Sequence, residues 1–238
     1  MVPITVVIPV FHDDRALVRT LGSTDFSGCE LIIAATAEDS SSLAPLRSEW
    51  PHARWVETAR GRARQMNAAA DAAHGDWIVF LHADTLLPSG WREAVETADR
   101  DPRVVVGCFR FALESPSLAA RAIEAGVRAR VGVFALPYGD QALFVRRRVF
   151  QEVGGYADIP IMEDVDLICR LRSRGRLFRS PLEALTSARK WERDGWIRRT
   201  VGNLYLIARY FAGTPPARLY HLYNNDHAHQ TPGRYSQL

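Results

Sequence analysis

Residues 4–36, ITVVIPVFHDDRALVRTLGSTDFSGCELIIAAT, decide the predicted fold. Two short runs rich in β-branched residues, ITVVIPV (4–10) and ELIIAAT (30–36), flank DDRALVRTLGS (13–23), whose apolar residues have helical spacing. A strand, a helix and a strand in this order are the unit from which α/β folds are built. Because the strand runs are continuously apolar, we expect a Rossmann-like, mostly parallel sheet with helices on both faces.

The same succession of strand and helix patterns continues downstream. RWVET (54–58) predicts a third strand, and the alanine-rich stretch GRARQMNAAADAAHG (61–75) predicts a helix that stops at its final glycine. DWIVFLHAD (76–84) predicts a buried strand, and since side chains alternate along a strand, His82 and Asp84 should lie on one side. Further patterns predict helices over 90–101, 116–136 and 162–175, a strand over 103–115, and a strand or turn over 142–150.

The chain changes character near residue 195. Residues 1–195 form the predicted α/β domain, whereas residues 196–238 form an extension in which WIRRTVGNLYLIARYFAG (196–213) predicts a basic amphipathic helix followed by a polar tail. Two interpretations of its apolar stripe stay open. The stripe packs on its own domain or on a second subunit, giving a homodimer, or it lies on an anionic membrane surface.

Composition excludes several classes of protein. The 238 residues carry 30 basic and 27 acidic side chains, which argues against a nucleic acid as partner. Three widely spaced cysteines without a C-x-x-C pair indicate neither a disulfide framework nor a zinc site. The apolar start lacks the cationic lead and cleavage site of a signal peptide, and no apolar run approaches the ~20 residues of a membrane span. We therefore expect a cytoplasmic protein, peripheral at the inner face of the membrane if its stripe binds lipid.

Arg60, Arg62 and Arg64 cluster at the amino end of the helix predicted to begin near Gly61. Cations are unfavourable beside the positive pole of a helix dipole by roughly 0.3 to 1 kcal/mol each. A bound phosphate on the free backbone N–H groups, held by arginine side chains, would reverse that sign. The alternative is that these arginines point into solvent.

His82 and Asp84 are placed to reach one ion at the end of their strand. A hard divalent cation such as Mg²⁺ or Mn²⁺ needs few protein carboxylates when substrate phosphates supply other oxygens. The alternative is an aspartate that caps its own loop.

Two further polar segments lie later in the chain. PIMEDVD (160–166) places Glu163, Asp164 and Asp166 in the first turn of a helix, where a carboxylate either caps the helix or serves as a general base. YGDQ (138–141) adds Asp140 and Gln141 in a turn, suited either to sugar hydroxyls or simply to turning.

Taken together, these segments resemble the family 2 glycosyltransferases of GT-A fold, and most closely the radical-SAM/selenodomain-associated transferase 2 subgroup, over about residues 3–193. The segments that carry the resemblance are RGRARQMNAA (60–69), FLHADT (80–85), PYGDQALFVRR (137–147), GGYADIPIMEDVDLICRLRSRG (154–175) and TSARKWERDG (186–195).

The resemblance implies transfer of a sugar, with inversion, from a nucleoside-diphosphate-sugar donor with the help of Mg²⁺ or Mn²⁺. HAD corresponds to the family's D-x-D element with His82 in the first acidic position, so that Asp84 and His82 would be the metal ligands. Arg62 and Arg64 would contact phosphates and Asn67 would support their loop. The implied donor-binding set is Pro9, Asp13, Arg62, Arg64, Asn67, His82, Ala83 and Asp84.

The resemblance also implies the catalytic and acceptor residues. MED matches the family's acidic motif, which makes Asp164 the base with Glu163 supporting it. SARKW is a loose form of the Q-x-x-R-W element, with Ser187 in place of Gln and Lys190 in place of Arg. The implied acceptor-binding set, for an acceptor that the sequence does not identify, is Tyr138, Gly139, Asp140, Gln141, Lys190 and Trp191.

Two departures from the family keep other functions open. Ala35 stands where relatives carry an aspartate that reads the nucleotide base, although Asp13 or Asp39 could compensate, and His12 stands in place of the usual Asn. A degenerate sugar- or nucleotide-binding protein is therefore one alternative. A nucleotidyltransferase on a similar sheet is another, against which the lack of a glycine-rich loop after the first strand argues.

Overall fold

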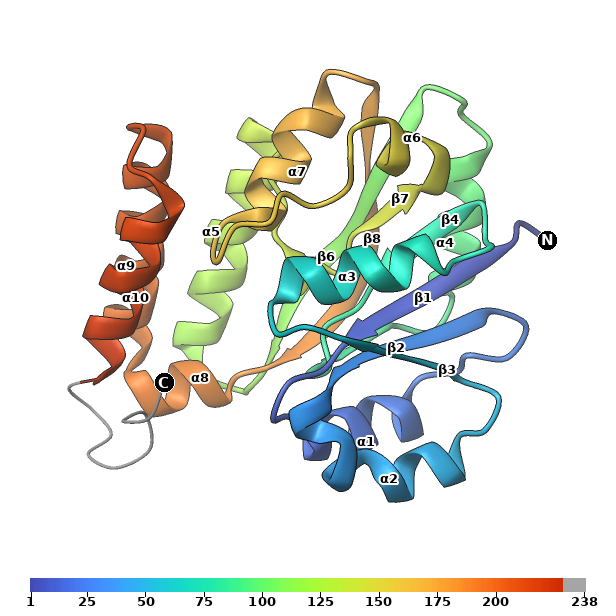
Figure 1. Ribbon diagram of the computed structural model, residues 1–238. Coiled ribbons are helices and arrows are strands. Elements are labelled where there is room, and N and C mark those ends of the chain that lie inside the picture. Colours follow the sequence, from blue (N-terminus) through green and yellow to red (C-terminus); the bar gives the residue numbers. More distant parts are fainter. Residues whose placement is uncertain (229–238) are drawn as a thin grey trace.

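The computed structural model of the chain describes residues 1–228. Within these residues one eight-stranded sheet runs in the order β3-β2-β1-β4-β7-β6-β8-β5 (Figure 1). Its strands are β1 (Ile4–Pro9), β2 (Glu30–Thr36), β3 (Arg54–Thr58), β4 (Trp77–Phe80), β5 (Thr85–Leu86), β6 (Val104–Glu114), β7 (Phe144–Arg146) and β8 (Arg176–Ser187).

The two halves of the sheet differ in strand direction. β1, β2, β3 and β4 pair in parallel, as the opening strand–helix–strand pattern predicts. β7 then runs antiparallel to both β4 and β6, β6 and β8 are parallel, and β5 closes the edge antiparallel to β8. The prediction of an α/β fold with a mostly parallel sheet is confirmed.

Helices cover both faces of the sheet because its strands are apolar on both sides. In β1, Ile4, Val6 and Ile8 face one core and Val7 faces the other. The first core is covered by α1 (Asp14–Ser23), α2 (Ser40–Glu49) and α4 (Trp91–Asp99). The second core is covered by α3 (Arg62–Asp71), α5 (Leu118–Phe134), α6 (Arg147–Glu152) and α7 (Glu163–Arg172).

The predicted strand over 76–84 is too long. β4 ends at Phe80, and His82 and Asp84 lie in a turn that the Thr85 N–H closes on the His82 carbonyl at 3.1 Å. Both side chains are nevertheless largely shielded from water, and that of Asp84 is 7% exposed. Because they lie in a turn and not in β4, strand alternation does not place them on one side.

β8 was not predicted from the sequence, because proline and charged residues interrupt its pattern. Cys108 pairs with Arg179 and Arg110 pairs with Glu183, so the register shifts where residues 180–182 face Phe109 alone. Pro181 lies in this bulge, where its missing N–H costs no ladder hydrogen bond. β8 then carries the chain to the SARKW segment beside the ends of β1 and β4.

Three helices complete the described chain: α8 (Arg189–Asp194), α9 (Trp196–Phe211) and α10 (Pro216–Ala228). α9 contacts α8 and α10 and also lies along α5, at the left of the molecule in Figure 1. In the described part of the chain, no helix has both the length and the apolar character needed to cross a bilayer. The domain boundary at residue 195 stays a prediction, and the last ten residues of the polar tail lie outside the described residues.

Candidate active site

The candidate site lies at the carboxyl ends of β1, β2 and β4, where ligands of open α/β sheets bind. Gln65 fixes this edge: its side chain is 2% exposed, and its Nε2 donates to the carbonyls of Val10 at 2.7 Å and Ala34 at 2.9 Å. These bonds hold the first turn of α3 against the ends of two neighbouring strands. The role of Gln65 was not predicted, although a glutamine within the RGRARQMN segment was the available signal.

Asp84 is held by two cations from the α8 segment. Its side chain is 7% exposed, and its Oδ2 lies 3.2 Å from Arg189 Nη2 and 3.4 Å from Lys190 Nζ. Burial acts to raise the pKa of Asp84, but the opposing charges, Lys190 above all, hold it below its usual value. Asp84 is therefore a carboxylate at neutral pH.

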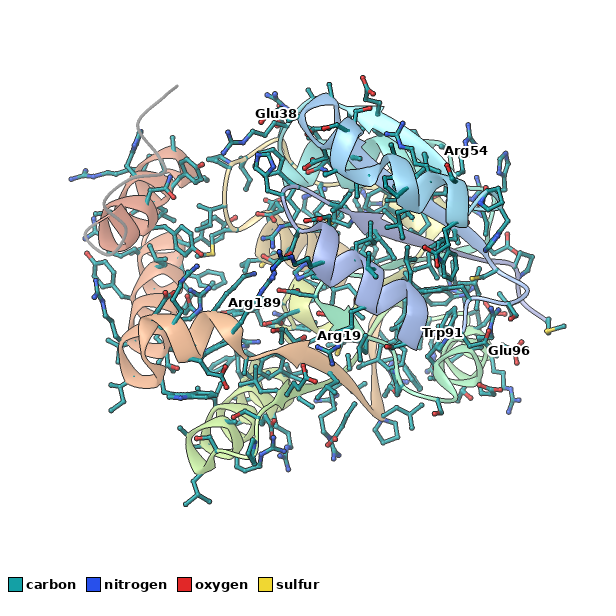
Figure 2. The ribbon with its side chains drawn as sticks, turned by 90° about the horizontal axis from the view of Figure 1, so that it is seen from below. Arg19, Glu38, Arg54, Trp91, Glu96 and Arg189 are labelled. Atoms are coloured by element: carbon teal, nitrogen blue, oxygen red, sulfur yellow. The ribbon has the colours of Figure 1, made fainter. Side chains whose placement is uncertain are left out.

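Arg189 extends this network to the start of α1. It forms a two-pronged ion pair with Asp13, in which Nη1 donates to Oδ1 at 2.7 Å, and it also contacts Asp84. Figure 2 shows Arg189 between the ribbons of α8 and α1. One guanidinium thus joins the loops after β1 and β4 to α8. The SARKW motif directed attention to Lys190, and its neighbour Arg189 was missed.

The side chains of His82 and Asp164 both lie close to Gly139. A Cβ at Gly139 would lie 2.7 Å from His82 Nε2 and 3.5 Å from Asp164 Oδ2, so the close approach requires glycine. Burial, with the charge of Arg62 adding to it, lowers the pKa of His82 to about 4, which leaves the imidazole neutral at pH 7. The HAD, YGDQ and MED segments therefore meet at one point.

Asp164 is fixed by backbone N–H groups at the start of α7. Its Oδ2 accepts from Gly139 N at 2.8 Å, and its Oδ1 accepts from its neighbour Val165 N at 2.8 Å. Glu163, with 2% of its side chain exposed, accepts from Arg62 Nε. This ion pair connects the first turn of α7 to the first turn of α3. Arg62 therefore faces an acidic cluster, Glu163 and Asp164, and not solvent alone.

Asp140 is a partly buried carboxyl group beside this cluster. Its Oδ1 is buried without a hydrogen-bond partner in the described part of the chain. Burial raises the pKa of Asp140 to about 6, because the partial compensation by Arg130 is smaller and Asp164 adds a like charge. Asp140 is the carboxyl group here whose charge changes just below neutral pH.

Other predicted residues support the site. Asn67 donates to the Tyr156 carbonyl and accepts from the Tyr156 N–H, both at 2.8 Å, and so fixes the loop before α7. Gln141 is 2% exposed and donates to the Phe109 carbonyl at 3.0 Å. The Tyr138 ring is covered by the guanidinium of Arg130, 3.3 Å from the ring centroid.

Pro9 and Ala83 contribute through the backbone, and Trp191 contributes an apolar surface. Pro9 is the last residue of β1, and the Ala83 carbonyl accepts from Thr20 Oγ1 at 2.7 Å. Trp191 is 8% exposed and packs on Phe111 with ring centroids 6.0 Å apart. These residues shape the site without carrying a charge into it.

Arg64 and Asp39 make their contacts outside the acidic cluster of Glu163 and Asp164. Arg64 forms an ion pair with Asp158 at 2.8 Å, and both side chains are more than half exposed. Asp39 is 2% exposed and accepts from Thr36 Oγ1 and the His12 N–H, each at 2.8 Å, so it fixes the loop after β1. Ala35 is buried in β2 within the first core.

The metal ligands expected from the sequence form a short donor set. Over residues 1–228, no group of three or more His, Cys, Asp or Glu side chains is arranged to hold a metal ion. Asp84 offers one carboxylate and His82 a neutral imidazole, and Asp84 already has two cationic partners. Mg²⁺ or Mn²⁺ accepts so few protein ligands when a diphosphate supplies further oxygens. These two residues would suffice for such a cation only if a diphosphate supplied the remaining oxygen ligands.

Residues 5–154 match the sequence model of glycosyl transferase family 2, which is more than half of the chain. The chain belongs to this family. No curated protein sequence matches it. The comparisons do not distinguish a subgroup, so the closer resemblance to the radical-SAM-associated subgroup stays a prediction.

Solved structures confirm the GT-A fold. Residues 1–349 of TarS from S. aureus, in complex with UDP-GlcNAc, align with a TM-score of 0.60 and 11% identity over 78% of this chain and 58% of that one. The mannosyltransferase PcManGT from Pyrobaculum calidifontis, in complex with GDP-Man and Mn²⁺, aligns with a TM-score of 0.61 and 17% identity over 91% of this chain and 66% of that one. The chain therefore spans less than two thirds of the length of these structures.

Proposed function

We propose that this protein transfers a sugar from a nucleoside-diphosphate-sugar donor to an acceptor hydroxyl, with inversion and with a divalent metal. The observation that carries the proposal is the meeting of HAD, YGDQ and MED around Gly139, at the ligand-binding edge of the sheet in a family 2 chain. The donor complexes of TarS with UDP-GlcNAc and of PcManGT with GDP-Man and Mn²⁺ support a nucleotide-sugar as the ligand of this fold.

Asp164 takes the proton of the acceptor hydroxyl as that oxygen bonds to the anomeric carbon. The bond from the anomeric carbon to the diphosphate oxygen breaks at the same time, and the departing diphosphate keeps the electron pair. Because Gly139 and Val165 donate to its two oxygens, Asp164 is held in place before the acceptor arrives. A positioned base of this kind contributes about 10² to 10⁴ in rate.

Cationic side chains stabilise the charge that develops on the leaving group. Arg62, Arg189 and Lys190 are each already oriented by a carboxylate partner, which is Glu163, Asp13 and Asp84 respectively. Preorganised charges stabilise a transition state without reorganising at the moment of reaction. A divalent cation held by Asp84 and His82 would supply further positive charge beside the diphosphate.

The test is the release of nucleoside diphosphate from a panel of UDP- and GDP-sugars, with Mn²⁺ or Mg²⁺ and with a chelator. We expect release that depends on the metal and falls in Asp84→Ala. Calorimetric donor titration that is indifferent both to metal and to Asp84→Ala would refute the metal assignment.

Two alternatives give different products. A nucleotidyltransferase releases pyrophosphate from a nucleoside triphosphate, and the family match argues against that reaction. A non-catalytic relative binds a donor without breaking it, so any turnover that Asp164→Asn removes excludes this alternative.

A further inference from the structure

A large apolar cavity is lined by α5 and α9. Its volume is about 1060 Å³, just above the usual range for small-molecule sites. The charged side chains that line it are Arg130, Asp140 and Arg172, and the other lining residues are mostly aliphatic or aromatic. Both helices contribute to its walls, with Ile123, Val127 and Val133 on α5 and Leu204, Ile207 and Phe211 on α9.

The inner end of this cavity adjoins the candidate active site. Tyr138, Asp140 and Trp191 line it, and Asp140 directly follows Gly139, whose N–H holds Asp164. Two polar atoms of these lining residues, Asp140 Oδ1 and Trp191 Nε1, are buried without a hydrogen-bond partner within the described residues. Both atoms are shielded from the cavity in this structure, whereas Tyr138 and Asp140 as whole residues are only partly buried, so this end offers some polar surface to the head of a ligand.

The outer end of the cavity is apolar and exposed. Val133 and Phe134 on α5 are 74% and 62% exposed, and Leu204 and Phe211 on α9 are 57% and 59% exposed, although all four line the same cavity. Single exposed apolar side chains are ordinary, whereas a group from two facing helices marks a binding surface. A ligand that covers them must itself be apolar over this length.

We propose that this cavity, the α5–α9 cavity, holds the hydrocarbon chain of a lipid acceptor, whose hydroxyl-bearing head reaches Asp164. The inference rests on the proposed sugar transfer. A free sugar acceptor would leave these apolar walls exposed to water, and a protein partner on α9 would not need a cavity that continues to Asp140. A chain anchored here places the reacting hydroxyl at the base while burying apolar surface.

The test uses n-alkyl β-D-glucosides with methyl, hexyl, octyl and decyl chains, titrated below their critical micelle concentrations by calorimetry. Affinity should rise about fourfold per methylene, which is the fold-change equivalent of ~0.8 kcal/mol of buried CH₂. Leu204→Glu and Phe211→Glu should remove this chain-length dependence. Both side chains are exposed, so neither substitution threatens the core.

Ile197→Glu is the matched control, because Ile197 lies on the same helix, is 80% exposed and does not line the cavity. It should bind the decyl glucoside as the unmodified protein does. Affinity independent of chain length, or loss of binding in Ile197→Glu equal to that in Leu204→Glu, would overturn the proposal. So would a dimer in solution that Leu204→Glu dissociates, because a second copy would then be the occupant.

Donor turnover is measured in the same variants, with water as acceptor. Chain-length-dependent binding by a protein that breaks no donor would support the cavity and refute the sugar transfer. Donor turnover with no dependence on chain length would support sugar transfer and refute the cavity assignment.

Discussion

The two sides of the candidate site differ in the polarity of their side chains. On the side of α3 and α8, three cationic side chains have acidic partners: Arg62 pairs with Glu163, Arg189 with Asp13, and Lys190 with Asp84. On the side of α5 and α9, apolar side chains line a cavity and many remain exposed. The first side is preorganised for a charged ligand, and the second gains free energy only when an apolar ligand displaces water.

Removing the proposed base on the charged side should cause the largest loss of transfer rate. We expect Asp164→Asn to lower transfer by about 10² to 10⁴ while donor affinity stays nearly unchanged. Single-turnover transfer and donor calorimetry measure the two effects separately. Asp166→Asn is the control, because Asp166 lies in the same helical turn but pairs with Arg170. Equal losses in both variants would show a damaged helix rather than a missing base.

A side chain added at Gly139 should displace His82 or Asp164 while leaving both residues in the chain. The added Cβ of Gly139→Ala would lie 2.7 Å from His82 Nε2, so His82 or the Asp164 contact must shift. Displacements near 1 Å cost about 10² in rate. Gly132→Ala is the control, since no atom lies within 4 Å of its added Cβ. A Gly139→Ala enzyme with full kcat would exclude close packing at this point as a requirement for transfer.

Asp140, at the junction of the two sides, should be a source of instability at neutral pH. Its folded pKa of about 6 lies above the usual 3.8, so the protonated form is favoured by folding. The resulting stabilisation is complete below the unfolded pKa and is lost as pH rises through 6. Asp140→Asn does not titrate, so at pH 7.5 its free energy of unfolding should exceed that of the unmodified protein by about 3 kcal/mol, and it should unfold at a higher temperature.

This gain should vanish near pH 4, where the Asp140 carboxyl is neutral as well. Thermal unfolding of both proteins between pH 4 and 8 makes the comparison. A constant difference across this range would mean that the substitution acts through shape rather than through charge.

Arg64 should matter least. Its ion pair with Asp158 is exposed, and pairs of that kind contribute about 0 to 1 kcal/mol. Arg64→Ala should therefore change the free energy of unfolding by less than about 1 kcal/mol. A large loss of donor affinity in the same variant would show that Arg64 leaves Asp158 for a phosphate, as the sequence resemblance implies. Chemical denaturation and donor calorimetry distinguish these outcomes.

Local pattern was sufficient for much of the fold and for several site residues. Continuous apolar runs gave the parallel strands, because burial on both faces leaves a signature within each segment. β8 was missed because Pro181 and its charged neighbours hide a strand whose bulge accommodates them. The strand end at Phe80 was misplaced because apolar character continues to Leu81, whereas the pairing of β4 with β1 ends at Phe80.

The sequence by itself determined the α/β class, the acidic first turn of α7 and the identity of the segments that meet at the site. Only the tertiary structure decided that Arg62 faces Glu163 while Arg64 faces Asp158, that Arg189 links Asp13 to Asp84, and that α5 and α9 enclose a cavity. The physical reason is the separation along the chain of the residues that interact. Secondary structure follows from periodicities within ten or so neighbouring residues, whereas ion pairing and enclosure depend on which distant surfaces packing brings together.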